Sequence, residues 1–377
     1  MANRVLQSLF LCFLLYSCSQ LEKAEEFIAG LPPEEQYKKD ENISDEIFEI
    51  WQNRKQKGLD ESLQIELPYL ESGTFKPRNF GIYSYETYMM PGEILEAEVI
   101  TDSSSTLVFT DIYKKEPSSE SFYKVHSGDA VQKVLKFEIK EKGLYKLIFQ
   151  PEIEANTPFQ IKIQRSPAYT FPVAEGENSD IGSYWGDIRD GGKREHKGID
   201  IFATRGTPVL AAVEGRIRFS GEKGLGGKQV WLWDRRRKQS LYYAHLDSIV
   251  PDIKKVKAGD TLGFVGNTGN AEFTPSHLHF GIYKKGQGAV DPLGYVHLPG
   301  HIGDENISKE EFSERLTIAT HKAGLRKKPS SSNSKLIKTG VIGEILYVQG
   351  KSTEWFHVRD SQDRPMFIHE SQVKSVN

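Results

Sequence analysis

Residues 276–282 read Ser-His-Leu-His-Phe-Gly-Ile, and the fold prediction starts from this short stretch. Polar and apolar residues alternate along it, and alternate side chains of a β-strand point to the same face. His277 and His279 should therefore share one face of a strand, while Leu278 and Phe280 point into a core. Two imidazoles above an apolar face suit the floor of a cleft. A His-x-His pair alone is a weak sign of function and is often incidental.

A second strand is predicted from His196 onward. Gly198 and the β-branched Ile199 and Ile201 favour a strand over a helix. His196 and Asp200 are four residues apart, an even spacing that places both on one face of such a strand. Ile199 and Ile201 would then face the core. For either motif alone, unrelated polar residues on solvated strands are the favoured alternative.

A third strand-like motif is expected to bring a further imidazole to the other two motifs. In the strand-like run Leu241 to Leu246, Tyr243 and His245 are predicted to share a face, so His245 could reach the same cleft. For Tyr243, packing is the favoured role over a hydrogen bond to substrate. Two His and a carboxylate, with a fourth position open to water, make a catalytic zinc site. A closed structural site would need four protein ligands, typically with Cys, and no Cys is available here.

In combination these motifs resemble the lysostaphin/LytM-type zinc metallopeptidases, which cut peptidoglycan peptides. The resemblance covers about residues 175–298. It rests on Arg194 to Asp200 with Gly206 to Gly215, on Tyr243 to Leu246, and on Gly263 to Gly269 leading to His277 through Phe280. It implies that His196, Asp200 and His279 bind zinc. It also implies that His245 and His277 line the site and assist catalysis.

The function implied by this resemblance is zinc-dependent hydrolysis of peptide cross-links in peptidoglycan, between D-alanine and meso-diaminopimelate in a Gram-negative envelope. Zinc would polarise the scissile carbonyl and lower the pKa of a bound water to about 7. His245 and His277 would activate the water, stabilise the oxyanion or protonate the leaving amine, and the sequence does not divide these roles. The alternatives are a non-enzymatic wall-binding regulator of amidases and a structural lipoprotein tethered to the wall.

Two stretches depart from the pattern of this family. Asn270 to Ser276 is longer than usual and lacks the common Ser-Thr-Gly-Pro run, and Gly281 stands where an acidic residue is common. Both affect one wall of the expected cleft. Tyr184 to Gly192 should form part of the rim, where Trp185 either contributes to the rim or simply packs. Arg235 to Lys238 is predicted as a solvated hairpin tip, with contact to anionic wall polymers or lipid as the second possibility.

The expected fold class is mainly β in three parts. Residues 61–168 are predicted as an antiparallel β-sandwich, because strand-like runs alternate there with turn residues. Its one His, His126, is expected in a surface loop. Residues 169–300 would form a lysostaphin-type antiparallel β peptidase domain. Residues 301–319 are a predicted linker with a short helix at Lys309 to Arg315.

Residues 320–377 resemble a small bacterial β-barrel of the Src-homology-three type. The resemblance rests on Gly324 to Pro329, Glu354 to Val358 and Phe367 to His369. Met366-Phe367 stands where such domains often carry Gly-Trp. Modules of this type often bind cell-wall peptides, and purely structural packing is the alternative.

The N-terminal residues are predicted to direct export. Residues 1–17 are read as a lipoprotein signal peptide, because Leu6 to Tyr16 is almost wholly apolar but too short to span a membrane. Leu15-Tyr16-Ser17-Cys18 resembles a bacterial lipobox, so Cys18 would be lipidated, with an ordinary signal peptide as the alternative. Ser19 then favours the outer membrane, facing the periplasm. Residues 18–60 are read as a tether with short helices, one of them at Asp45 to Lys57.

Composition excludes one class of partner. The chain has 377 residues, 27% of them charged, and a formal net charge of −3. This balance gives no sign of a nucleic-acid partner. The expected partners are peptidoglycan peptides and, through the lipid anchor, a membrane.

Overall fold

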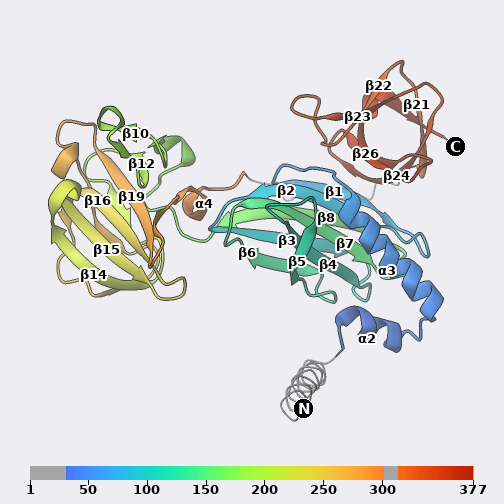
Figure 1. Cartoon of the computed structure of the whole chain (residues 1–377), viewed down its shortest axis with the longest axis horizontal. Helices are drawn as coiled ribbons and strands as arrows, with labels where there is room; N and C mark the ends of the chain where they lie inside the picture. Colours follow the sequence, from blue (N-terminus) through green and yellow to red (C-terminus); the bar gives the residue numbers. More distant parts are fainter. Residues whose placement is uncertain (1–30, 301–312, 377) are drawn as a thin grey trace, which may run out of the picture.

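The structure is a computed structural model that describes residues 31–300 and 313–376. It is mainly β with antiparallel sheets, as predicted. The expected signal peptide, Cys18 and most of the expected helix at 309–315 lie outside the described residues. Within the described ranges, none of the helices combines the length and the apolar character that a membrane crossing requires. Figure 1 shows strands β9 (Ile181–Ser183) to β20 (Gly288–Val290) of the central part of the sequence on the left, a sandwich in the middle of the view and a small body of strands at the upper right.

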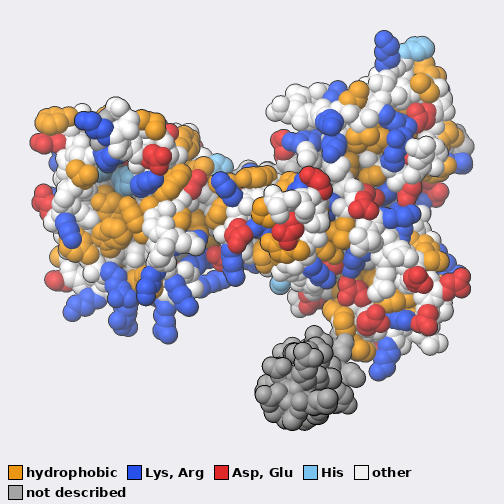
Figure 2. All heavy atoms as spheres, viewed as in Figure 1, with side chains coloured by type: hydrophobic (Ala, Val, Ile, Leu, Met, Phe, Trp, Pro, Cys, Tyr) orange, Lys and Arg blue, Asp and Glu red, His pale blue; other side chains and the backbone are white. Residues whose placement is uncertain are grey.

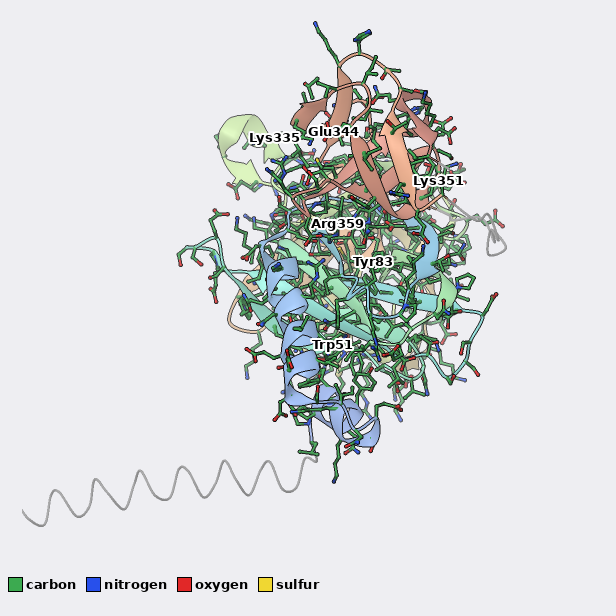
Figure 3. The ribbon with its side chains drawn as sticks, turned by 90° about the vertical axis from the view of Figure 1, so that its right-hand side faces the viewer. Trp51, Tyr83, Lys335, Glu344, Lys351 and Arg359 are labelled. Carbon is green, nitrogen blue, oxygen red and sulfur yellow. The ribbon has the colours of Figure 1, made fainter. Side chains whose placement is uncertain are left out.

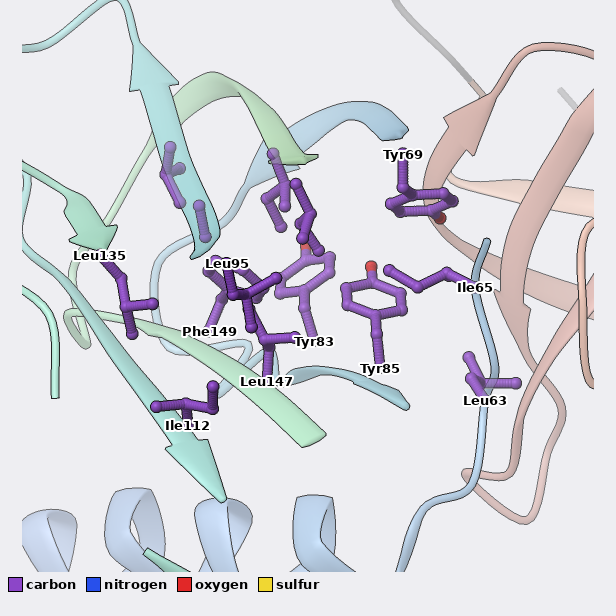
Figure 4. Packing of buried hydrophobic residues seen from close by; sticks show 14 of the residues in the cluster. Leu63, Ile65, Tyr69, Tyr83, Tyr85, Leu95, Ile112, Leu135, Leu147 and Phe149 are labelled. Atoms are coloured by element: carbon purple, nitrogen blue, oxygen red, sulfur yellow. The ribbon is translucent and has the colours of Figure 1, made fainter. Parts of the chain in front are cut away.

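The sandwich has two facing sheets. One contains β2 (Tyr83–Met89), β7 (Gly143–Pro151), β4 (Val108–Lys115) and β5 (Phe122–Ser127), in that order. The other contains β1 (Tyr69–Phe75), β8 (Thr157–Pro167), β3 (Glu93–Thr101) and β6 (Val134–Glu138). Buried side chains from both sheets fill the space between them, among them Tyr85, Leu95, Leu147 and Phe149 (Figure 4). His126 is exposed as expected, although it lies on strand β5 instead of in a loop.

Two helices precede the sandwich, α2 (Pro33–Asp40) and α3 (Asp45–Asp60). Ser44 caps α3 by accepting a hydrogen bond from the amide of Ile47. The helix lies along the sandwich (Figure 3), where Trp51 is buried against Phe109 and donates a hydrogen bond to the carbonyl of Pro151 at 2.9 Å. The segment expected as a tether is therefore partly packed on the sheet.

The domain in the middle of the sequence, called the central domain below, runs from β9 to β20 and is built on one large sheet. The strand order is β17 (Lys255–Val256), β14 (Gly215–Glu222), β15 (Lys228–Asp234), β16 (Gln239–Ile249), β19 (His277–Lys284), β12 (Ile199–Phe202) and β9 (Ile181–Ser183). Off this path, β13 (Pro208–Leu210) pairs with β18 (Thr261–Val265), and β20 (Gly288–Val290) pairs with β19. A separate ribbon joins β10 (Ile188–Arg189) to β11 (Arg194–Glu195), and α4 (Leu293–Val296) follows the sheet.

One face of this sheet covers the core, as the alternating sequence predicts. Ile199, Ile201, Leu278 and Phe280 are all fully buried in one hydrophobic cluster. The side chains between them in the sequence therefore face the other side of the sheet, where the cleft lies.

The C-terminal strands form a third body that is joined to the sandwich. They are β21 (Arg315–Ile318), β22 (Ala323–Arg326), β23 (Leu336–Gly340), β24 (Ile345–Ser352), β25 (Trp355–Arg359), β26 (Pro365–His369) and β27 (Val373–Ser375). Arg315 therefore begins a strand inside the stretch expected as a linker. Strand β24 pairs with β1 at Ser72 and Lys351, and the buried His357 lies 3.0 Å from the carboxylate of Glu71.

Candidate functional site

Three adjacent strands carry four of the five predicted site residues. In the antiparallel pair β12–β19, Asp200 lies directly opposite His279. On the other side of β19, Ala244 of β16 lies opposite His279, and His245 is the next residue. Directly opposed residues have Cβ atoms about 4.5–5.5 Å apart, so this register alone brings the side chains into one site.

His196 reaches the site in a way that the sequence did not predict. The expected continuous strand from His196 to Asp200 is wrong, because β11 ends at Glu195 and β12 begins only at Ile199. Between them the chain passes so close to β19 that a Cβ on Gly198 would lie 2.5 Å from the carbonyl oxygen of Phe280 and 2.7 Å from the ring of His279. Glycine is therefore required at this crossing, and the crossing places His196 beside His279.

Three potential ligand atoms meet at one point. The Nε2 atom of His196 and the Nδ1 atom of His279 each lie 3.0 Å from Oδ1 of Asp200, and they lie 3.0 Å from each other. Zinc bonds of about 2.0–2.1 Å in a tetrahedral site separate ligand atoms by about 3.3 Å, so these three atoms would need to move apart by only about 0.3 Å to hold zinc. Within residues 31–300 and 313–376, this is the group of His, Cys, Asp or Glu side chains that could hold a metal ion.

Neighbouring groups orient these donor atoms. The Nδ1 atom of His196 lies 2.9 Å from the carbonyl oxygen of Tyr184, so Nδ1–H donates there and Nε2 keeps its lone pair. Arg189 donates a hydrogen bond of 2.7 Å to Oδ2 of Asp200, which leaves Oδ1 for the site. Burial acts to raise the pKa of Asp200, but hydrogen bonds with His196 and His279 outweigh it and hold that pKa well below its usual range. The converging lone pairs and the ionised carboxylate fit a divalent cation.

His245 and His277 complete the group from the other side. The Nδ1 atom of each lies 2.8 Å from a backbone carbonyl, that of Thr268 for His245 and that of Pro275 for His277. Both rings line the cleft, and their centroids are 5.1 Å apart. Burial lowers the pKa of His245 to about 4, so its imidazole is neutral at pH 7. A neutral ring that donates from Nδ1 has Nε2 available as a proton acceptor.

A β-bulge in β16 reverses one prediction. Ala244 and His245 together lie opposite the single residue Gln229, and His245 has a positive φ of 64°. Tyr243 therefore does not share a face with His245. It is fully buried in the core, and its hydroxyl accepts a hydrogen bond of 2.9 Å from the amide of Ala212. Packing is the observed role of Tyr243, as the sequence favoured.

Tyr242 takes the place in the cleft that the alternation assigned to Tyr243. It lines the pocket, with its ring centroid 5.7 Å from that of His279 and 4.5 Å from that of Trp231. Sequence reasoning missed Tyr242 because a bulge leaves no mark in the alternating pattern. It also named Arg189 only as part of the rim, without its contact to Asp200.

The cleft has a volume of about 640 Å³ and is walled by loops. Leu225 lines the cleft and is 60% exposed, while Phe273 is 95% exposed and lies in the chain between the lining residues Ala271 and Thr274. Phe273 lies in the stretch whose length departs from the family pattern. On the rim expected at Tyr184 to Gly192, Lys197 lies over the ring of Trp185, 5.2 Å from its centroid.

Comparisons with known proteins identify the central domain. Residues 194–292 match peptidase family M23. The L-Ala–D-Glu endopeptidase of Bacillus subtilis is 34% identical over 142 residues, which are 34% of this chain and 43% of that protein. The murein hydrolase activator NlpD of Escherichia coli is 32% identical over 102 residues, 27% of this chain and 26% of that protein. The catalytic domain of lysostaphin from Staphylococcus simulans is 32% identical, with a TM-score of 0.28, and the match covers 30% of this chain and 89% of that domain.

The chain thus spans less than half the length of these two curated relatives. The match to the family includes His196, Asp200, His245, His277 and His279. Residues 194–292 of this chain are therefore a domain of peptidase family M23.

Proposed function

We propose that the protein is a zinc metalloendopeptidase that hydrolyses peptide cross-links of peptidoglycan. The observation that carries the proposal is the convergence of His196, Asp200 and His279 on one point, with two further imidazoles beside it. A structural metal would need no extra histidines with available Nε2 atoms. The membership of residues 194–292 in peptidase family M23 supports the same reaction class.

His196 Nε2, Asp200 Oδ1 and His279 Nδ1 would hold the zinc. When bound, zinc would supply Lewis-acid polarisation of the scissile carbonyl and a water of lowered pKa. His245 is neutral at pH 7 and would accept a proton from the attacking water through Nε2. The carbonyl of Thr268 fixes the orientation of that ring. His277 is held in the same way by Pro275 and would hydrogen-bond the oxyanion or the leaving amine.

The proposed substrate bond joins D-alanine to meso-diaminopimelate, and the proposed location is the cell envelope, through a lipid on Cys18. The location rests on the lipobox-like sequence, and the bond rests on the resemblance to peptidases that cut peptidoglycan peptides. Relatives named as an L-Ala–D-Glu endopeptidase and as a murein hydrolase activator support an envelope role. The sandwich and the C-terminal strands are proposed as accessory modules, the latter of Src-homology-three type. Leu225 of the cleft lining and the exposed Phe273 would contribute to the choice of substrate.

Incubation with purified sacculi tests the proposed function. The full chain should release uncrosslinked muropeptides, a chelator should stop the release, and added zinc should restore it. His279→Ala should be inactive. His126→Ala, which removes an exposed histidine of the sandwich, is the matched control and should retain activity. Unchanged sacculi to which the protein still binds tightly would contradict the proposal and favour the non-enzymatic regulator.

A further inference from the structure

A strongly basic groove lies on the central domain, away from the metal-site residues. It has a volume of about 1000 Å³ and is lined by strands β14, β15 and β17. Its lining holds six cationic side chains and two carboxylates. The cations are Arg216, Arg218, Arg235, Arg236, Arg237 and Lys255, and the carboxylates are Glu214 and Asp234. Figure 2 shows Lys and Arg side chains gathered along this lower edge of the domain.

Carboxylates of the protein neutralise only a small part of the positive charge of this groove. Arg237 is neutralised, because it binds both Asp234 and Glu138. Arg236 reaches Glu138 only at 3.6 Å and stays 78% exposed. Within the part of the chain that the structure describes, no carboxylate lies within 4.0 Å of the charged groups of the exposed Arg216, Arg235 and Lys255. Such a concentration of like charge costs free energy unless it meets an anionic partner.

The groove also has an amphipathic aromatic floor. Trp233 is partly buried, and the guanidinium of Arg218 lies 5.3 Å from its ring centroid. Trp and Tyr are enriched where proteins meet the polar surface of a membrane, because their rings are apolar at one end and polar at the other. A Trp surrounded by unneutralised Arg and Lys fits the phosphates and glycerol region of lipid headgroups.

The position of the groove is compatible with membrane contact and catalysis at the same time. In the sheet, β15 and β16 separate β14 from β19, the strand that carries His279. A surface bound at β14 and β17 would therefore leave the cleft open. Helix α2, at the start of the described residues, lies on the same lower side of the molecule as the basic edge (Figures 1 and 2).

We propose that this groove, formed around Arg216, Arg218, Arg235 and Lys255, docks the central domain on an anionic phospholipid surface. The interaction is independent of an acyl chain on Cys18. Each Lys or Arg near an anionic membrane strengthens binding by about fivefold, so four of them are sufficient for a specific electrostatic contact. Docking would hold the cleft at a set height above the membrane that carries the protein.

Vesicle co-sedimentation tests this inference. The full chain carrying Cys18→Ser, which excludes an acyl chain, is mixed with phosphatidylcholine vesicles with and without phosphatidylglycerol. We expect binding only when phosphatidylglycerol is present, and loss of binding at high salt. The variant with Arg216, Arg218, Arg235 and Lys255 all replaced by serine should bind at least about tenfold more weakly.

A control variant removes the same charge elsewhere. It replaces the exposed Arg315, Lys322, Lys335 and Lys374 of the C-terminal body by serine, and it should bind vesicles like the parent. Equal binding of both variants, or no binding of the parent to phosphatidylglycerol vesicles, would overturn the inference. The inference would also be overturned if the groove variant lost binding to sacculi but kept its binding to vesicles, because the groove would then bind a wall polymer. Muropeptide release measured on the same preparations separates this result from a failure of the proposed peptidase activity.

Discussion

The Nε2 atom of His196 lies 3.0 Å from the Nδ1 atom of His279, although 83 residues separate them in the chain. The contact depends on the close passage of the segment before β12 across β19. Gly198 makes this passage possible, because any Cβ there would collide with the carbonyl of Phe280 and the ring of His279. The geometry of the proposed metal site thus depends on a residue that carries no functional group.

Gly198→Ala should therefore weaken zinc binding. We expect at least about a tenfold loss of affinity, the size typical of changes to groups that position metal ligands. Competition with a chromogenic chelator measures this affinity. Gly81→Ala is the matched control, because its nearest neighbour would be an ordinary contact at 3.6 Å, and it should leave zinc affinity unchanged. Equal affinities of the two variants would show that the close passage does not set the site.

His245→Ala should separate catalysis from metal binding. The ring is not among the three potential ligands, so we expect zinc content to remain. Loss of a positioned proton acceptor should lower kcat by about 10²–10⁴-fold. Muropeptide release and elemental analysis of the same sample check both parts. A variant that lost its zinc together with its activity would place His245 among the ligands instead.

The sequence was a good guide to the site where the strands are regular. Alternation correctly placed Ile199, Ile201, Leu278 and Phe280 in the core, and this assignment leaves Asp200 and His279 facing the cleft. It was wrong at Tyr243, because a bulge in β16 turns Tyr243 into the core while His245 still reaches the cleft. A bulge is specified by pairing with the neighbouring strands, which lie outside the short run of residues that the alternation rule reads, so the rule could not reveal it.

In the parts that flank the central domain, features set by neighbouring residues in the sequence were also predicted better than contacts between distant residues. The helix expected at Asp45 to Lys57 is present, because its capping and apolar spacing are local. Its packing through Trp51 against Phe109 is a contact between remote residues and was not predicted. Strand β1 contains Gly73, a residue of low strand propensity, and its pairing with β8 and β24 supplies the structure that propensity does not.

Because of the bulge in β16, we expect opposite effects from substitutions of the adjacent Tyr242 and Tyr243. Tyr243→Phe leaves the buried amide of Ala212 without its partner, so it should lower the free energy of unfolding by about 1–2 kcal/mol. Tyr242→Ala should leave stability nearly unchanged but reduce kcat/KM up to about tenfold, because it removes a ring from the cleft floor. Urea unfolding and muropeptide release distinguish the two effects. The reverse pattern would show that Tyr243 faces the cleft.

A buried carboxylate in the sandwich predicts a pH dependence of stability. Burial acts to raise the pKa of Asp111, but Lys55 at 2.8 Å and Lys124 at 2.7 Å outweigh it and lower that pKa. A lowered folded-state pKa stabilises the protein above the unfolded value of about 3.9, and this contribution is lost as the pH falls through the folded value.

Asp111→Asn should therefore destabilise the protein at pH 7 by about 1–3 kcal/mol and have a smaller effect in acid. Thermal unfolding over a pH series measures this difference. Asp45→Asn, which removes the 96% exposed partner of Lys38, should have no measurable effect. A loss of stability for Asp111→Asn that stays constant down to the lowest pH would contradict the linkage.

The zinc content of the purified protein tests the central claim most directly. Elemental analysis after dialysis should find one zinc ion per chain in the parent and in His126→Ala, and almost none in His279→Ala or Asp200→Ala. This result would follow if His196, Asp200 and His279 form the metal site. A full complement of zinc in His279→Ala, with its fold confirmed by circular dichroism, would contradict the account.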